Sequence, residues 1–158
     1  WLLEHNFDMS IEQICSGPGL TQLYNYYSAR GEVLPAEWVR QEAKTTDNLA
    51  PIIVKGATAA DPCPLCVKVT NRFLGLLGSE SGNLAWKLYA RGGLYIGGGV
   101  LLHMLGKISF QPFVEAFRTK GKMSGLLQGI PVFLITKKHI NLHGAVLYAK
   151  KKIGYHLG

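Results

Sequence analysis

Three glycines at the end of a short apolar segment are the residues of this sequence best suited to hold a ligand. Residues 94–96 read Leu-Tyr-Ile and are followed by Gly97, Gly98 and Gly99, after which residues 100–105 are largely apolar. Glycines at the carboxyl end of a strand let a ligand approach the backbone, and a helix that begins there offers free amide groups. The segment lacks the Gly-x-Gly-x-x-Gly and Gly-Lys-Ser/Thr patterns of nucleotide sites. It predicts a ligand near a strand end, and tight packing of a helix on a strand explains it about as well.

Glu12 is the second residue whose position suggests chemistry. Ser10 and Gln13 fit a capping box, which predicts that a helix begins here with Glu12 in its first turn. A carboxylate in that place stabilises the positive end of the helix dipole. Ser16 and Gly17 interrupt the helix four residues later, and this break would instead leave the carboxylate facing a cleft. Both interpretations of Glu12 stay open on the sequence alone.

Cysteine and histidine spacings give weaker signals. Cys63 and Cys66 have the spacing of a zinc or redox pair, but the sequence has no second pair at zinc-like spacing. His139 and His143 lie four residues apart without the acidic residue of a zinc-protease motif between them. We predict that the cysteines pack at the start of a helix, that no metal is bound, and that His103 lies in the core or at its rim.

The charge balance favours a phosphorylated partner. The chain has 17 Lys and Arg residues against 10 acidic residues and a formal net charge of +7, a balance typical of proteins that bind nucleotides or nucleic acids. The basic residues are scattered, apart from Lys137–Lys138 and Lys150–Lys152, and are not interleaved with aromatic side chains as a nucleic-acid groove requires. We therefore expect no nucleic-acid partner, and lysines on solvated faces or at a helix end explain most of the positive charge.

Length and composition predict a folded domain. Of the 158 residues, 47% are hydrophobic and 17% are charged, which excludes a disordered chain. The uncharged stretch Gly92–Gly106 holds six glycines, is too short to span a membrane and is expected to be buried core. Three cysteines argue against a disulfide scaffold, and no secretory signal is visible. We expect a cytoplasmic location and no membrane partner.

Hydrophobic periodicity predicts a helix-rich α/β domain in which helices alternate with two short strands. Both strands are apolar on both faces, as in a buried parallel sheet. The sequence begins at Trp1 without a Met, in what reads as the middle of an element, so we expect a fragment whose further strands lie upstream. The predicted helices cover residues 10–30 with a break at Ser16–Gly19 and an end at Gly31, 35–43, 47–59, a long segment from Asp61 disturbed at Gly78–Gly82, 110–120 and 141–152; the strands cover 94–96 and 132–135.

Taken together, these segments resemble bacterial-type glucokinases, the hexokinase-like sugar kinases of the actin-like ATPase superfamily. The resemblance runs from about Ser10 to the end of the chain and corresponds to the C-terminal half of the family's sequence. The Ser-Gly-Pro-Gly-Leu motif combined with the glycine-ended strand is its most specific feature. The segments that carry it are Ser10–Leu20, Cys63–Cys66, Gly82–Ala85, Gly92–Gly99 and Ile130–Val132.

The resemblance implies that residues 1–158 are the C-terminal, large domain of a two-domain sugar kinase with a ribonuclease H-like fold, whose N-terminal domain is absent. ATP and Mg²⁺ are the implied cofactors, glucose is the implied substrate, and a homodimer is compatible with the family. Glu12 matches the carboxylate that binds sugar hydroxyls, and Gly97, Gly98 and Gly99 match the adenosine motif. The implied reaction is the phosphorylation of glucose to glucose 6-phosphate, the first step of glycolysis.

Other family motifs do not occur in this sequence. The phosphate loop, the Asn-Asp pair that deprotonates the sugar hydroxyl and the Glu-x-x-His sugar motif are missing, so we expect no catalytic residue in this fragment and no kinase activity from it alone. Within the matched part, Gly97 replaces the usual Ala, and Asn141–His143 adds bulk to a turn near the nucleotide. Two other functions compete with the enzyme: a non-catalytic sugar-sensing module and a plain basic nucleotide- or nucleic-acid-binding domain.

Overall fold

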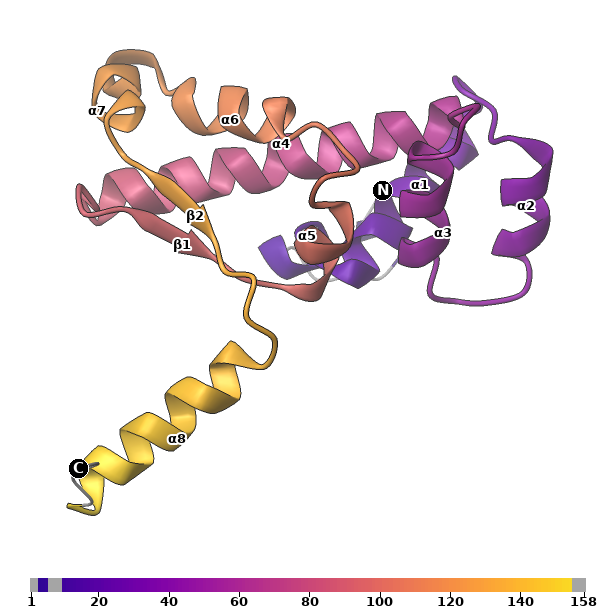
Figure 1. Ribbon diagram of the computed structural model, residues 1–158. Coiled ribbons are helices and arrows are strands. Elements are labelled where there is room, and N and C mark those ends of the chain that lie inside the picture. The colour runs from indigo at the N-terminus through magenta and orange to yellow at the C-terminus, as the bar shows by residue number, and fades with distance from the viewer. Residues whose placement is uncertain (1–2, 6–9, 155–158) are drawn as a thin grey trace.

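Helix α4 (Pro64–Lys87) runs through the middle of the molecule, and several other helices pack against it (Figure 1). The computed structural model describes residues 3–5 and 10–154, so the predicted mid-element start at Trp1 lies outside the described residues. The predicted helices and strands are confirmed to within a few residues. The remaining elements are η1 (Leu3–His5), η2 (Ile11–Gln13), α1 (Gly17–Arg30), α2 (Glu37–Ala43), α3 (Ala50–Ala57), β1 (Leu94–Ile96), α5 (Gly99–Met104), α6 (Gln111–Arg118), η3 (Gly121–Met123), α7 (Ser124–Gln128), β2 (Val132–Leu134) and α8 (Ile140–Lys152).

Helix α4 is continuous through Gly78–Gly82, where the sequence predicts a disturbance, so that prediction is wrong. The reason is the close approach of α6. A Cβ atom built on Gly78 would lie 2.9 Å from the carbonyl carbon of Phe113, and one built on Gly82 would lie 2.7 Å from the carbonyl oxygen of Phe117. Glycine weakens an isolated helix. Here it lets two helix backbones meet, and the burial of both phenylalanine side chains offsets that cost.

The segment before α1 is the three-residue 3-10 helix η2, and the predicted capping box at Ser10 is wrong. Ser10 has an extended backbone, and its side chain makes no capping hydrogen bond. The cap belongs to Ser16, whose Oγ accepts a hydrogen bond from the Gly19 amide at 3.1 Å. Pro18 follows in the first turn of α1, and Gly31 ends that helix with φ 66°. The new helix begins at Ser16 because the cap and the proline both favour a start there.

Strands β1 and β2 pair in parallel, with Leu94 opposite Val132, as the sequence predicts. The expectation that both faces of the sheet are buried is wrong. On one face Tyr95 and Phe133 stack with ring centroids 5.0 Å apart and are 65% and 44% exposed. The other face packs on the helical core. The helical core covers one face of this two-stranded sheet. Within the described part of the chain, no helix lies over the face that carries Tyr95 and Phe133.

Residues Gly92–Gly106 are only partly buried, which corrects the prediction of a buried core segment. Leu101 and Met104 of α5 lie in the core, whereas the glycines before them and His103 are exposed. His103 therefore lies at the rim. A six-residue helix at the edge of the core buries only one face.

Helix α8 projects away from the other elements (Figure 1), and none of its side chains is buried. Its last turn carries Lys150, Lys151 and Lys152, which complement the negative end of the helix dipole, as predicted. Among the helices of residues 3–5 and 10–154, none combines the length and the apolar character that crossing a bilayer requires.

Candidate functional site

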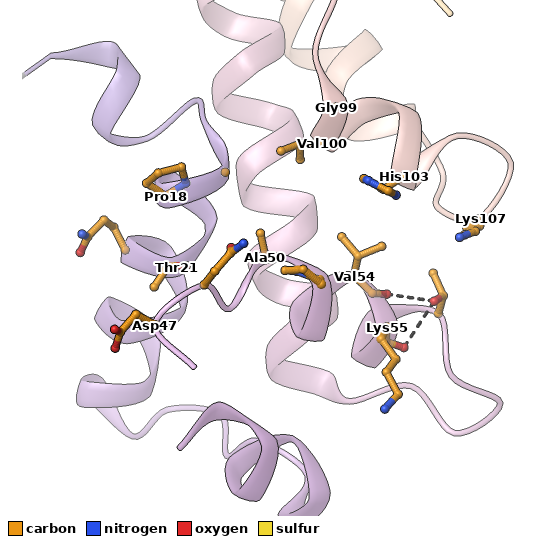
Figure 2. Close-up of a pocket in the computed structure, with 15 residues that line it drawn as sticks. Pro18, Thr21, Asp47, Ala50, Val54, Lys55, Gly99, Val100, His103 and Lys107 are labelled. Carbon is orange, nitrogen blue, oxygen red and sulfur yellow. Dashed lines mark hydrogen bonds between the residues drawn. The ribbon is translucent and has the colours of Figure 1, made fainter. Parts of the chain in front are cut away.

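A cavity of about 830 Å³ opens between α1, α3 and α5, and we call it the interhelical cavity. Figure 2 shows side chains from all three helices around it. Pro18 and Thr21 come from α1, Val54 comes from α3, and Val100 and His103 come from α5. The cavity therefore brings together residues that are up to 90 positions apart in the sequence, from Gly17 to Lys107.

Local contacts hold these three helices at the cavity. A Cβ atom built on Gly17 would lie 3.6 Å from Val100 Cγ2, an ordinary van der Waals contact between the start of α1 and α5. The Leu49 amide donates a hydrogen bond to Thr21 Oγ1 at 3.2 Å, which ties the start of α3 to α1. The Thr58 hydroxyl donates to the carbonyl of Val54 at 2.9 Å and closes the other end of α3 (Figure 2).

The walls of the interhelical cavity are apolar and its edge is polar. Ala50, Pro51, Val54 and Val100 form much of the wall. The polar edge carries Thr21, Gln22, Asp47, Asn48, Thr58, His103 and two lysines, Lys55 and Lys107. An apolar slot with a few polar groups at one edge is the usual form of a small-molecule site.

One carboxylate and one engaged lysine set the charge of this edge. Asp47 is the single acidic residue among the described residues that line the cavity. Lys55 is held outward, because its Nζ lies 2.5 Å from a Glu42 carboxylate oxygen and 4.9 Å from the centre of the Trp38 ring. The exposed Asp47 carboxylate therefore remains at the cavity, whereas the Lys55 ammonium group is engaged elsewhere.

A second cavity, of about 920 Å³, lies where β1 and β2 end, and we call it the strand-end cavity. Gly97, Gly98 and Gly99 follow β1 and line it, and Lys137 and Lys138 follow β2 on its other side. Ligands of open α/β sheets commonly bind beyond the carboxyl ends of the parallel strands. The two cavities share Gly99 and His103.

The three glycines of the sequence-based prediction therefore lie at a strand end and line the strand-end cavity, and Gly99 also lines the interhelical cavity. Gly98 has φ 145° and ψ 145°, a backbone conformation that residues other than glycine rarely adopt. A Cβ atom built on Gly98 or Gly99 would meet no atom within 4 Å. Open space, rather than tight packing of a helix on a strand, surrounds these two positions.

Asn141 and Leu142 also line the strand-end cavity. The segment Asn141–His143, which departs from the family pattern, lies in the first turn of α8, with His139 at the N-cap in the left-handed conformation. Two of the three side chains of this segment thus form part of the wall of the strand-end cavity.

Glu12 lies apart from both cavities. It is exposed in η2 and lines neither of them. Because η2 has three residues, the helix-dipole interpretation of Glu12 applies to a single short turn. The backbone connects it to the Ser16 cap, which opens α1 beside the interhelical cavity.

The cysteine pair is structural, as the sequence predicts. Cys63 is the N-cap residue of α4, and its Sγ accepts a hydrogen bond from the Ala36 amide at 3.3 Å. Both Cys63 and Cys66 are buried, and burial followed by the neighbouring Cys63 thiol raises the pKa of the Cys66 thiol. Within the described ranges no three His, Cys, Asp or Glu side chains lie close enough together to hold a metal ion.

Sequence reasoning missed most of the interhelical cavity. Residues 45–60, which supply much of its lining, lie outside the segments that carry the family resemblance. The one available signal was the polar pair Asp47-Asn48 just before a helix with Pro51 in its first turn. That pattern marks the start of a helix, but it does not say what the helix start faces.

The chain resembles known glucokinases along most of its length. The glucokinase family model matches residues 1–152. The glucokinases of Yersinia enterocolitica and Yersinia pestis are 35% and 34% identical to it over 149 residues, which cover 94% of this chain and 43% of each relative. The crystal structure of a glucokinase from an Antarctic psychrotroph superposes with a TM-score of 0.71 at 35% identity and covers 92% of this chain and 41% of that one. The chain thus spans less than half the length of these relatives.

Proposed function

This chain belongs to the glucokinase family, and we propose that it forms the nucleotide-binding and part of the sugar-binding site of an ATP-dependent kinase that makes glucose 6-phosphate from glucose. The family match over residues 1–152 carries this proposal. In the reaction the glucose 6-hydroxyl oxygen forms a bond to the γ-phosphorus, ADP leaves, and the hydroxyl proton passes to a base. In the family that base belongs to the Asn-Asp pair that this sequence lacks, so the chain alone would not turn over.

The shape and lining of the interhelical cavity support its assignment to adenosine. A purine base has two apolar faces and a polar edge, and this cavity offers apolar walls at Val54 and Val100 with the hydrogen-bonding groups of Thr21, Asp47 and Asn48 at one side. Gly99, at the far wall, would let the ribose approach the backbone. We assign Gly97, Gly98 and Gly99 to the passage from the nucleoside to its phosphates.

Glu12 is proposed to bind the sugar. An ionised carboxylate accepts hydrogen bonds from two hydroxyls and so distinguishes sugars by the geometry of their hydroxyl groups. Glu12 is exposed and lies before the Ser16 cap, outside the interhelical cavity. A residue of a separate sugar subsite would have such a position. The rest of that subsite would come from outside this chain.

We further propose that the chain is the C-terminal, large domain of a two-domain kinase with the actin-like ATPase fold. Helices with a short parallel sheet support this architecture. The chain covers 43% of the relatives' length, which leaves room for the other domain.

Magnesium would be held mainly by groups outside the described residues. Mg²⁺ prefers oxygen ligands and binds kinases through one or two carboxylates and the phosphates of the nucleotide. The described residues bring no cluster of acidic side chains together, and Asp47 is the one carboxylate that lines either cavity.

The test is a coupled assay for glucose 6-phosphate on the complete protein with glucose, mannose and fructose in parallel. Turnover with glucose and not with the other sugars supports the proposal. Glucose binding without turnover would favour the sugar-sensing module instead. Binding of nucleotide that collapses between low and moderate salt and does not depend on glucose would favour the plain basic binding domain.

A further inference from the structure

The net positive charge of this protein comes from its last 43 residues, 116–158. All ten acidic residues lie at or before Glu115, whereas eight of the 17 Lys and Arg residues follow it. Residues 1–115 are therefore close to neutral, and residues 116–158 carry the whole excess. A segment with cations and no carboxylate of its own produces a positive field that favours an anionic ligand.

Two of these cations stand at the strand-end cavity. Lys137 and Lys138 line it directly after β2, and His139 follows them at the start of α8. The loop Gly97–Gly99 lines the same cavity, and a Cβ atom built on Gly98 or Gly99 would meet no atom within 4 Å. No acidic residue lines this cavity within the described part of the chain.

Lys137 and Lys138 differ from the two lysines that the described residues hold in ion pairs. Lys55 pairs with Glu42 and Lys68 pairs with Glu32 at 2.9 Å. For Lys137 and Lys138 the residues of ranges 3–5 and 10–154 supply no ion pair. Two lysines that line one cavity attract an anion more strongly than one lysine does, because the Coulomb attractions of both ammonium groups add.

We propose that the strand-end cavity is a phosphate subsite in which Lys137 and Lys138 contact the polyphosphate of the nucleotide. This inference rests on the proposed function, because it takes the adenosine to lie in the interhelical cavity. The two cavities meet at Gly99 and His103, so one ligand can occupy both, with its base between the helices and its phosphates at the strand ends. The lysines supply compact charges on flexible stems, which suits a phosphate chain without fixed geometry.

The same chemistry would also accept a phosphate-bearing ligand with no nucleoside. Three probes distinguish the sources: adenosine occupies only the interhelical cavity, tripolyphosphate only the strand-end cavity, and ATP both. Titration calorimetry measures the binding of each probe to the 158-residue chain. A metal chelator in the buffer ensures that basic side chains, and not a bound metal ion, attract the phosphates.

The decisive variant is Lys137→Gln/Lys138→Gln, and the matched control is Lys151→Gln/Lys152→Gln, which removes the same charge at the far end of α8. Circular dichroism checks that both variants stay folded. We expect the first variant to bind ATP and tripolyphosphate about tenfold more weakly, because charge-assisted hydrogen bonds are lost, and to bind adenosine as the unmodified chain does. The control should bind all three probes as before.

Unchanged ATP and tripolyphosphate binding in Lys137→Gln/Lys138→Gln would overturn the subsite, and so would an equal loss in the control, which would indicate only a general effect of net charge. Failure of adenosine to bind the unmodified chain contradicts the proposed nucleotide site alone. In that case a loss of tripolyphosphate binding confined to Lys137→Gln/Lys138→Gln would still support a phosphate subsite.

Discussion

Gly78 of α4 lies directly against the backbone of Phe113 in α6. A Cβ atom built on Gly78 would lie 2.9 Å from both the Cα and the carbonyl carbon of Phe113 and closer still to its carbonyl oxygen. Real Cβ atoms do not approach a backbone this closely. The contact fixes the distance between α4 and α6, and therefore where the chain leaves the core towards β2 and the strand-end cavity.

Gly78→Ala should destabilise the fold, because the backbone of α6 must move away. Overpacking of this kind typically costs about 1–3 kcal/mol, measurable as the free energy of unfolding in urea. Gly75→Ala is the matched control in the same helix, since its Cβ would lie 3.9 Å from the nearest atom, Pro112 O. It should be neutral or stabilise the helix by about 1 kcal/mol. Equal stabilities for the two variants would contradict the close packing.

The Ser16 cap should matter for stability, and Ser10 should not. Ser16→Ala removes the hydrogen bond to the Gly19 amide and should cost about 1 kcal/mol of unfolding free energy. Ser10→Ala removes a hydroxyl that makes no capping bond, and its cost should stay within about 0.5 kcal/mol. A larger loss for Ser10→Ala than for Ser16→Ala would restore the capping box that the sequence predicts.

Gly99→Ala should weaken adenine nucleotide binding without weakening the fold. The added methyl group meets no protein atom within 4 Å but projects from a residue that both cavities share. One extra methyl in a binding pocket changes affinity by about tenfold or more, which calorimetry with ATP would detect. Gly125→Ala is the control, because its Cβ is equally unhindered and lies in α7, away from the residues that line the two cavities.

Glu12→Gln in the complete protein should weaken glucose binding and leave nucleotide affinity and unfolding free energy nearly unchanged. The lost charge-assisted hydrogen bonds correspond to about a tenfold weaker affinity, read by titration with glucose. Glu37→Gln, another exposed carboxylate at a helix start, should leave glucose binding intact. If Glu12→Gln leaves glucose affinity unchanged, then Glu12 only stabilises the dipole of the short helix η2.

Stability should fall as the pH rises above about 9. Burial raises the pKa of the Cys66 thiol above its ordinary value of 9.0, so the native state keeps a proton that the unfolded chain releases. The stabilisation is complete below the ordinary pKa and declines above it, by up to about 1.4 kcal/mol per pH unit for one group. Urea unfolding between pH 8 and pH 10 measures the slope.

The Cys66→Ala variant should show a shallower decline over the same pH range. A smaller part of the slope should remain, because burial also raises the pKa of the Cys15 thiol. An identical slope in Cys66→Ala and the unmodified chain would contradict the assignment to Cys66.

The sequence alone determined most of the helices and both strands to within a few residues, the packing of the Cys63–Cys66 pair at a helix start, and the family. Helix periodicity, Pro18 near the start of α1 and Gly31 at its end are local signals that act over a few residues. The family motifs are contiguous, so they need no knowledge of the fold. The glycines after β1 are visible in the same way.

Tertiary structure alone decided which residues meet. Asp47 and Gly99 line one cavity because α1 and α3 pack on α4 and α5 packs on α3. Helix α4 passes unbroken through Gly78 because the backbone of α6 lies against it. Both outcomes depend on contacts between residues 35 or more positions apart. Such contacts form through burial of surface between whole elements, and no local pattern of residue types records them.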